Sequence, residues 1–411
     1  MGEHNPITDI SYVSKINKSK ILSLIRSREV ISRAEIGKEM GLSLPTVSRL
    51  VDSLIHHEKL VLEVGTATPS RGRPPQLVKF AGDANYVIGL TIGPKYIYAL
   101  LSNLNAHIIT DTRFPTQAED GVEMMVKRIA DAVQEMSRQS GVNIAHVLGV
   151  GIGVGGLIDS KRNLLAYSSA FGWENVDLSG ELSRYLDIPI KFDNVARVMA
   201  LGELWYGIGQ SVKDFLSIYV GHGIGMCAVI DGKPHYGSTG MTGELGHCTF
   251  EMPSGGSIFL EEVAGGRGIA RVAKERISEY PDSLLHQYCE GHLDTITAET
   301  VALAANRGDE LSKDIFARAT KYLGAAVSNL IHLYNPQAVV IGGGVAQAGD
   351  FFFEGIKQAV KERALPRLAE DVIIQPAYHG ARTKEMGAVA LILNEVLSLE
   401  ISNHKEKIAA R

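Results

Sequence analysis

The sequence has little cysteine and no long apolar run. Its three cysteines, Cys227, Cys248 and Cys289, are odd in number and lack C-x-x-C spacing, so we expect neither a disulfide framework nor a cysteine zinc site. The first residues lack the basic and then apolar pattern of a signal peptide, and no stretch reaches the roughly 18–20 apolar residues that span a bilayer. We therefore expect a cytoplasmic protein that makes no membrane contact.

A strong overall charge is also absent, since the formal net charge is −5 over 411 residues. The charge is unevenly distributed, because residues 1–80 carry twelve Lys and Arg against eight Asp and Glu, a net charge of +4. A chain of this length predicts two or three domains. The basic N-terminal part and the acidic remainder indicate that only the former meets a polyanion such as DNA.

Residues 17–80 have the pattern of a winged helix-turn-helix. Apolar residues recur at helical spacing over 17–31, and Ser32 with Glu35 forms a capping box at the start of a second helix. After a turn at 41–43, Ser43 caps a third helix that has Pro45 in its first turn. Residues 60–64 and 76–80 alternate like the strands of a hairpin. Two short helices joined by a glycine turn predict a second helix that enters the major groove.

Two groups of side chains are candidates for contacts with DNA. The polar residues that point outward near the start of the third helix are Ser43, Thr46, Ser48 and Arg49, with Arg49 as the candidate reader of guanine. At the hairpin tip, Arg71 and Arg73 flank a glycine and suit a narrow minor groove. The alternative is a protein-interaction module in which both hairpin arginines are solvated linker charges.

The remaining chain alternates buried strands with helices, which predicts an α/β protein. Apolar runs at 86–92, 147–154, 216–220 and 338–341 read as strands, 122–139 reads as an amphipathic helix, and 188–190 reads as a short strand before a helix. Strands run into glycine turns near residues 93, 221 and 342, where backbone N–H groups can approach a phosphate closely. This repetition resembles the loops of the actin-like ATPase and sugar-kinase superfamily.

A narrower resemblance rests on the order of the motifs. Residues 86–395 resemble the ROK family of sugar kinases and sugar-responsive repressors through Asp193-Asn194-Val195-Ala196, Gly221-His222-Gly223-Ile224-Gly225, Gly243-Glu244-Leu245-Gly246-His247, Leu260-Glu261 and Gly342-Gly343-Gly344. The N-terminal part resembles the DNA-binding domain of the repressor branch, down to Arg71-Gly72-Arg73-Pro74. The resemblance implies an actin-like (ribonuclease H-like) two-lobed α/β fold with an N-terminal winged helix-turn-helix domain.

The expected domain boundaries follow from this resemblance. Residues 1–82 form the DNA-binding domain, and 83–196 form lobe I, which the C-terminal residues 380–402 complete. Residues 197–379 form lobe II, which is expected to carry the oligomerisation surface of a homodimer or homotetramer on operator DNA.

The sequence departs from the family's kinases at the positions that perform phosphoryl transfer. Their first phosphate loop carries an aspartate and two glycines, whereas this chain has Thr91 and Pro94 there, and Pro94 removes an N–H donor. Val195 stands at the position of the general base, where it accepts no proton. We therefore expect no catalytic residue, no kinase activity and no ATP. The alternative is an active sugar kinase with a regulatory DNA-binding domain.

The zinc site of the family is also expected to be lost. Its three cysteine positions hold Met252, Ser254 and Phe259, which are not tetrahedral zinc ligands. Cys248 is expected to be a small buried residue. We predict no structural zinc and no other metal.

The residues that the resemblance places around a sugar are retained. It implies that Asn194, Glu244, His247 and Glu261 line the pocket, with Gly156 in a loop against the ring and Asp193 at the same strand end. Carboxylate, imidazole and amide groups suit the hydroxyls of a polyol, each of which donates and accepts. The predicted function is a sugar-responsive transcriptional repressor whose lobes close on the ligand about a hinge near Asp193 and Gly202. A third possibility is an oligomerisation module with an empty cleft.

Overall fold

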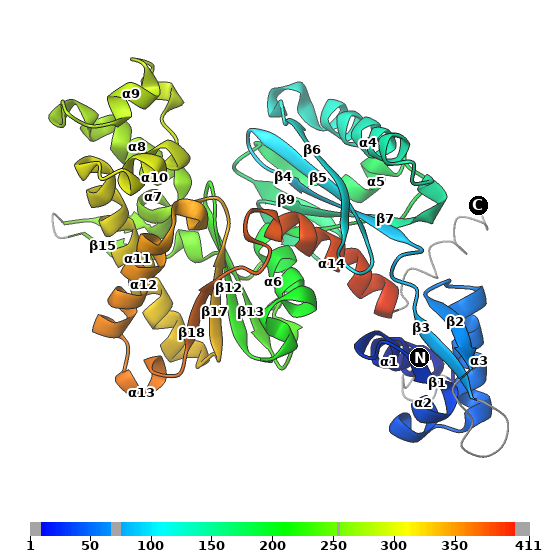
Figure 1. The fold of residues 1–411 in the computed structure, drawn as a ribbon. Coiled ribbons are helices and arrows are strands. Elements are labelled where there is room, and N and C mark those ends of the chain that lie inside the picture. Colours follow the sequence, from blue (N-terminus) through cyan, green and yellow to red (C-terminus); the bar gives the residue numbers. More distant parts are fainter. Residues whose placement is uncertain (1–9, 67–74, 253–254, 399–411) are drawn as a thin grey trace, which may run out of the picture.

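The computed structural model describes residues 10–66, 75–252 and 255–398. Its three parts are a small N-terminal domain and two larger lobes (Figure 1). Each of the two lobes is built on a five-stranded sheet. This confirms the predicted mixed α/β fold. None of the helices in these ranges is long and apolar enough to cross a membrane.

The N-terminal domain packs three helices against a three-stranded sheet of order β1-β3-β2. Its elements are α1 (Ile10–Ser27), β1 (Ile31–Ser32), α2 (Arg33–Met40), α3 (Leu44–His56), β2 (Val61–Thr66) and β3 (Gln76–Phe80). The predicted capping box is confirmed, since Ser32 accepts from the Glu35 backbone N–H and the Glu35 carboxylate accepts from the Ser32 backbone N–H. Ser43 caps α3, whose Val47, Leu50, Val51 and Leu54 are buried as predicted.

The first helix differs from the prediction at both ends. α1 begins at Ile10 and ends at Ser27, whereas Ile31 belongs to β1 and pairs with Val78 of β3. Ile31 is buried in the domain core in either case. A two-residue strand has no period of its own, so its apolar residue could be read as a continuation of the helix.

Lobe I contains a sheet of order β11-β7-β4-β5-β6. Its strands are β4 (Tyr86–Ile92), β5 (Tyr96–Asn103), β6 (Ile108–Pro115), β7 (Val147–Val154) and β11 (Ile190–Asn194), with α4 (Gly121–Ser140) packed on it. A second small sheet holds β8 (Leu157–Asp159), β9 (Leu164–Ser168) and β10 (Trp173–Val176), followed by α5 (Leu178–Leu182). The predicted strand at 188–190 is wrong in position, because β11 begins at Ile190 and includes Asp193 and Asn194, which pair in parallel with β7.

Lobe II contains a sheet of order β14-β13-β12-β17-β18. Its strands are β12 (Phe215–Val220), β13 (Ile224–Ile230), β14 (Lys233–Pro234), β17 (Ala338–Gly342) and β18 (Ile373–Pro376). The remaining elements are the hairpin β15 (Thr249–Glu251) and β16 (Ser257–Phe259), and the helices α7 (Leu260–Ala264), α8 (Gly266–Arg276), α9 (Leu285–Cys289), α10 (Ala298–Asn306), α11 (Glu310–Tyr334), α12 (Asp350–Arg363) and α13 (Pro366–Ala369). The core of this lobe gathers around α11.

Two helices connect the lobes and cross between them. α6 (Val195–Tyr206) leads from β11 to lobe II, and α14 (Thr383–Ser398) returns from lobe II to pack on β4 and β7 (Figure 1). The crossing depends on glycine, because a Cβ at Gly387 would lie 2.1 Å from the Val198 carbonyl oxygen and one at Gly202 would lie 3.1 Å from Gly387 Cα. Gly202 therefore lies inside a helix at a close backbone contact.

Candidate functional site

A cleft lies between the two lobes. Lobe I contributes Thr91 to Pro94, Gly155, Gly156, Ser168 to Phe171, Asn194 and Val195 to its lining, together with Lys384 of α14. Lobe II contributes Tyr219, His222 to Gly225, Glu244, His247, Glu261 and Arg267. The space between these residues measures about 990 Å³, including open solvent at its mouth. Of the predicted sugar-binding residues, the structure brings Gly156, Asn194, Glu244, His247 and Glu261 together here.

Asn194 lies at the junction of β11 and α6, where its side chain serves two local purposes. Its Oδ1 accepts from the Ala196 backbone N–H at 2.8 Å and so caps α6, while its Nδ2 donates to the Gly156 carbonyl oxygen at 2.8 Å. One amide hydrogen and one lone pair remain for a ligand. The two contacts hold the amide and the Gly156 loop in a fixed relation at the wall of the cleft.

Asp193 does not line the cleft, which corrects the prediction for this residue. Its side chain points into the core, where Oδ1 accepts from Arg197 Nε at 2.8 Å and from Arg197 Nη2 at 2.5 Å. Both residues are buried, with exposed fractions of 5% and 1%. Successive side chains of a strand point to opposite faces, so Asp193 and Asn194 cannot both face the ligand. Asp193 therefore neutralises a buried arginine.

Val195 lines the cleft directly beside Asn194 and is 9% exposed. Its side chain carries no proton acceptor. The position that the kinases of the resembled family use for their base is thus an apolar part of the wall in this chain.

The lobe II wall holds two carboxylates and two histidines. Glu244 precedes a short 3-10 turn at Leu245–His247, His247 is the last residue of that turn, and Glu261 lies in α7. Glu261 Oε2 sits between two glycines, since a Cβ at Gly223 would lie 2.6 Å from it and one at Gly246 would lie 2.9 Å away. These glycines therefore let the Gly221–Gly225 turn and the 3-10 turn close around the Glu261 carboxylate.

Burial changes the acidity of two groups in the cleft. Burial raises the pKa of Glu244, and the neighbouring Glu261 adds to this, while His247 and Arg197 oppose it. Burial lowers the pKa of His222, which Arg267 and Lys95 lower further. His222 is therefore held neutral at pH 7, where it can donate and accept one hydrogen bond each.

Several residues that line the cleft were not among the sequence predictions. Lys384, from α14, reaches the cleft near Tyr219, and Arg267 lies 3.7 Å from Glu261. Phe171 also lines the cleft, with its ring 4.8 Å from that of Trp173. Lys384 and Phe171 belong to none of the motifs that carried the resemblance. Only the return of α14 to lobe I brings Lys384 to the cleft.

The end of strand β4 is bound to α14. Thr91 Oγ1 donates to Glu385 Oε1, and Lys384 Nζ lies 3.8 Å from the same carboxylate. Thr91 and Glu385 are both buried. In the segment that the resemblance aligns with the first phosphate loop of the kinases, the Thr91 hydroxyl is therefore already bonded within the chain.

The segment that corresponds to the family's zinc site forms the β15–β16 hairpin, in which Thr249 pairs with Phe259. Among the described residues, which exclude Ser254, no three His, Cys, Asp or Glu gather as metal ligands would. Phe259 and Met252 do not fit a zinc ion. Cys248 is exposed, which corrects the prediction that it is buried. It lies where the chain leaves the 3-10 turn for the hairpin.

The candidate DNA-binding surface lies at the start of α3. Ser43 and Arg49 are exposed, whereas Thr46 and Ser48 are half-buried. The Ser43 hydroxyl is 2.8 Å from Thr46 Oγ1 and accepts from the Thr46 backbone N–H, so its primary role is the helix cap. Leu44, which the sequence interpretation missed, is 53% exposed beside them. Arg71 and Arg73 lie outside the described residues.

Comparison with known proteins gives relatives of two kinds. The ROK family pattern matches residues 87–395. A xylose repressor of Caldicellulosiruptor bescii is 28% identical over 403 residues, which cover 97% of this chain and 99% of that protein. A glucokinase of Halalkalibacterium halodurans is 32% identical and covers 78% of this chain and 99% of that protein.

Comparison with solved structures also gives both regulators and sugar kinases. The crystal structure of a ROK family transcriptional regulator, described as a homologue of the E. coli MLC protein, covers 95% of this chain with a TM-score of 0.78 and 25% identity. A ROK family glucokinase from Streptomyces griseus, in complex with glucose and AMPPNP, covers 75% with a TM-score of 0.67 and 26% identity. The similarity to regulators thus extends over the N-terminal domain, and the chain belongs to the ROK family.

Proposed function

We propose that this protein is a sugar-responsive transcriptional repressor. The observation that carries the proposal is the combination of a winged helix-turn-helix domain with a cleft that has hydrogen-bonding groups for a polyol but Val195 in place of a catalytic base. Relatives named as xylose repressors, which match 97% and 96% of this chain, support the same function.

In the proposed complex, the ligand is a sugar held between the lobes. Glu244 and Glu261 accept hydrogen bonds from its hydroxyls, and His247 and Asn194 donate or accept further ones. Gly156 supports the ring from lobe I. Because these groups come from both lobes, a bound sugar favours the closed arrangement of the lobes over an open one.

We propose no enzymatic activity and no cofactor. Phosphoryl transfer needs an oriented base and a site for metal-bound phosphate. Val195 accepts no proton, Pro94 offers no N–H, and Thr91 is already bonded to Glu385. A relative named as a glucokinase favours the alternative of a sugar kinase, so ATP is included in the test.

The proposed partners are operator DNA, a sugar and a second copy of the chain. A symmetric homodimer or homotetramer places two recognition helices in successive major grooves. The proposed location is the cytoplasm, where such a repressor meets its operator, without membrane contact.

Thermal unfolding of the full chain tests the ligand first. D-xylose, D-glucose and other common pentoses and hexoses are added separately, with ATP and Mg²⁺ in a parallel series. A ligand that binds only the folded state raises its stability by about 2.7 kcal/mol at a hundredfold excess over Kd. Stabilisation by a sugar and not by ATP supports the sensor, whereas stabilisation by ATP with transfer of phosphate to the sugar supports the kinase.

Binding to DNA is tested with operator fragments selected from random duplexes by the purified protein. Specific binding that changes when the stabilising sugar is added is the expected result. A protein that selects no sequence, or whose affinity no sugar changes, contradicts the proposed function.

A further inference from the structure

Two helices begin at the cleft and extend to the N-terminal domain. α6 starts at Asn194 and Val195, which line the cleft, and ends at Trp205 and Tyr206. Its 12 residues span about 18 Å at 1.5 Å per residue. α14 likewise starts with Lys384 in the cleft, and α1 packs against it farther along.

The two helices are held together as one unit. Their backbones meet at Gly387, where a Cβ would lie 2.1 Å from the Val198 carbonyl oxygen. Buried Glu203 of α6 adds a second attachment, because its Oε1 accepts from the Tyr378 backbone N–H at 2.7 Å in the segment before α14. A shift of α6 at the cleft therefore moves its far end and α14 with it.

The far end of α6 contacts the DNA-binding domain through one arginine. The Arg26 guanidinium, in the last turn of α1, lies 3.9 Å from the centre of the Trp205 ring, and its Nη2 donates to the Trp205 carbonyl oxygen at 3.2 Å. Trp205 is 7% exposed. A cation over an aromatic face that also bonds a carbonyl at a helix C-terminus has a defined orientation.

Apolar packing continues across the same contact. The core of the N-terminal domain, with Ile21, Leu22 and Ile25 of α1, forms one continuous cluster with Trp205 and with Leu391 and Val396 of α14. The N-terminal domain thus packs against the α6–α14 pair (Figure 1). Its orientation follows from where that pair lies.

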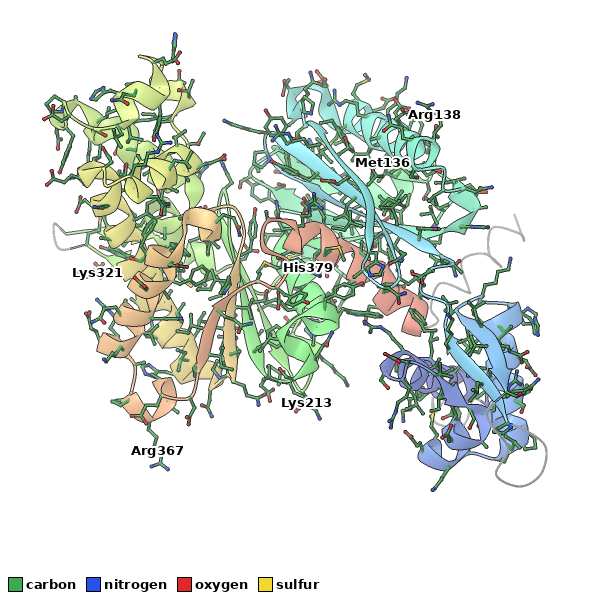
Figure 2. All side chains as sticks on the ribbon, in the orientation of Figure 1. Met136, Arg138, Lys213, Lys321, Arg367 and His379 are labelled. Carbon is green, nitrogen blue, oxygen red and sulfur yellow. The ribbon has the colours of Figure 1, made fainter. Side chains whose placement is uncertain are left out.

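The contact also contains two polar atoms that lack partners among the described residues. Tyr206 Oη and His379 Nε2 are buried without hydrogen bonds, although their rings are 5.4 Å apart. Figure 2 labels His379 close to the start of α14. A hydroxyl and an imidazole nitrogen are complementary, and leaving both unpaired costs free energy. The junction between α6 and the segment before α14 thus keeps two unpaired polar atoms in its interior.

We propose that Arg26 and Trp205 are positioning residues, which fix the DNA-binding domain on the α6–α14 pair in an orientation set by sugar in the cleft. This inference rests on the proposed function. Neither residue touches sugar or DNA in this proposal. They transmit a movement of the α6–α14 pair, caused by sugar in the cleft, to the DNA-binding domain.

The test compares four variants of the full chain: Arg26→Leu, Arg26→Lys, Trp205→Leu and the control Arg28→Leu. Arg28 is an exposed arginine of the same domain that pairs with Glu39 of α2 at 3.1 Å. D-xylose and D-glucose are the probes, and the selected operator is the DNA. Calorimetry gives the Kd for sugar, and titration gives the Kd for operator with and without saturating sugar.

The measured quantity is the ratio of the two operator Kd values, which is typically about 5–150 for coupled sites. We expect Arg26→Leu and Trp205→Leu to bring this ratio close to 1 while the Kd for sugar stays within about threefold of the unmodified value. Arg26→Lys keeps the charge but loses the planar stack and is expected to retain an intermediate ratio. Arg28→Leu keeps the full ratio. If Trp205→Leu does not fold, the two Arg26 variants carry the test.

Two results contradict the proposal in distinguishable ways. If the unmodified protein responds to sugar and Arg26→Leu responds equally, the positioning role is wrong and the proposed function stands. If the operator affinity of the unmodified protein changes with none of the sugars of the thermal-unfolding series, D-xylose and D-glucose included, the proposed sensing function fails, and the positioning role fails with it.

Discussion

The Glu261 carboxylate lies in the cleft between the backbones of two glycines, Gly223 and Gly246. We predict that Glu261→Gln weakens sugar binding by about 10- to 150-fold, because a hydrogen bond to a charged group contributes about 1.5–3 kcal/mol. Calorimetry with the stabilising sugar measures the change. Glu262→Gln is the matched control, since the neighbouring side chain caps α7 by accepting from the Phe259 backbone N–H and lies outside the lining. If the two variants bind the sugar with equal affinity, Glu261 does not contribute to sugar binding.

Glu244 gives a prediction for the dependence of stability on pH. Its pKa in the folded protein is raised above the ordinary value of 4.5, chiefly by burial, so the folded state binds this proton more tightly than the unfolded chain does. The resulting stability is present below the unfolded pKa and is lost as pH rises through the folded pKa. Glu244→Gln cannot ionise. It should therefore unfold at a higher temperature than the unmodified protein at pH 7, with the difference vanishing near pH 4.

Thermal unfolding between pH 4 and pH 8 checks this expectation, with Glu251→Gln on exposed β15 as the control. The same variant should bind sugar more weakly at pH 7, because an amide replaces a charged acceptor. A Glu244→Gln protein that is less stable at pH 7 than at pH 4, relative to the unmodified chain, contradicts the sign of the argument.

At the scale of elements, the start of α3 is the surface that reads DNA in the proposed function. Arg49 is exposed there and suits the two acceptors of guanine in the major groove. Arg49→Ala should weaken operator binding by about 1–3 kcal/mol and relax the preference at one base pair of each half-site. Repeated selection from random duplexes measures both effects. Arg28→Ala, off this helix, should leave the selected sequence unchanged.

The crossing of α6 and α14 depends on Gly387. A methyl group at this position would meet the backbone of Val198, which cannot move aside alone. Gly387→Ala should lower the free energy of unfolding by at least about 1–3 kcal/mol, as overpacking of a core does. Denaturant unfolding measures it. Gly344→Ala is the control, since a Cβ there meets nothing within 4 Å, and a similar loss in both variants would show that the crossing is not the cause.

At the scale of the whole molecule, the proposed repressor works as a symmetric oligomer. The prediction is a dimer or a dimer of dimers in solution, measured by light scattering after gel filtration. The selected operator should contain two inverted half-sites whose centres lie about 34–36 Å apart, one helical turn. A monomer that binds a single half-site with full affinity contradicts this arrangement.

Much of the fold follows from local patterns. The capping box of α2, the Ser43 cap and buried stripe of α3, the helix α4 and the strands that end in glycine turns are each set by residues within a few positions of one another. The same patterns failed where an element was too short to have a period. The two-residue β1 is the example.

The class of fold, the family resemblance and the motif residues that meet in the cleft can all be predicted from the order of residues along the chain. Three contacts required the folded chain to be seen: Asp193 turns inward to Arg197, Lys384 returns to the cleft with α14, and Arg26 stacks on Trp205. The physical reason is separation along the chain. Caps and turns depend on neighbours, whereas these contacts depend on which elements the packed core brings together.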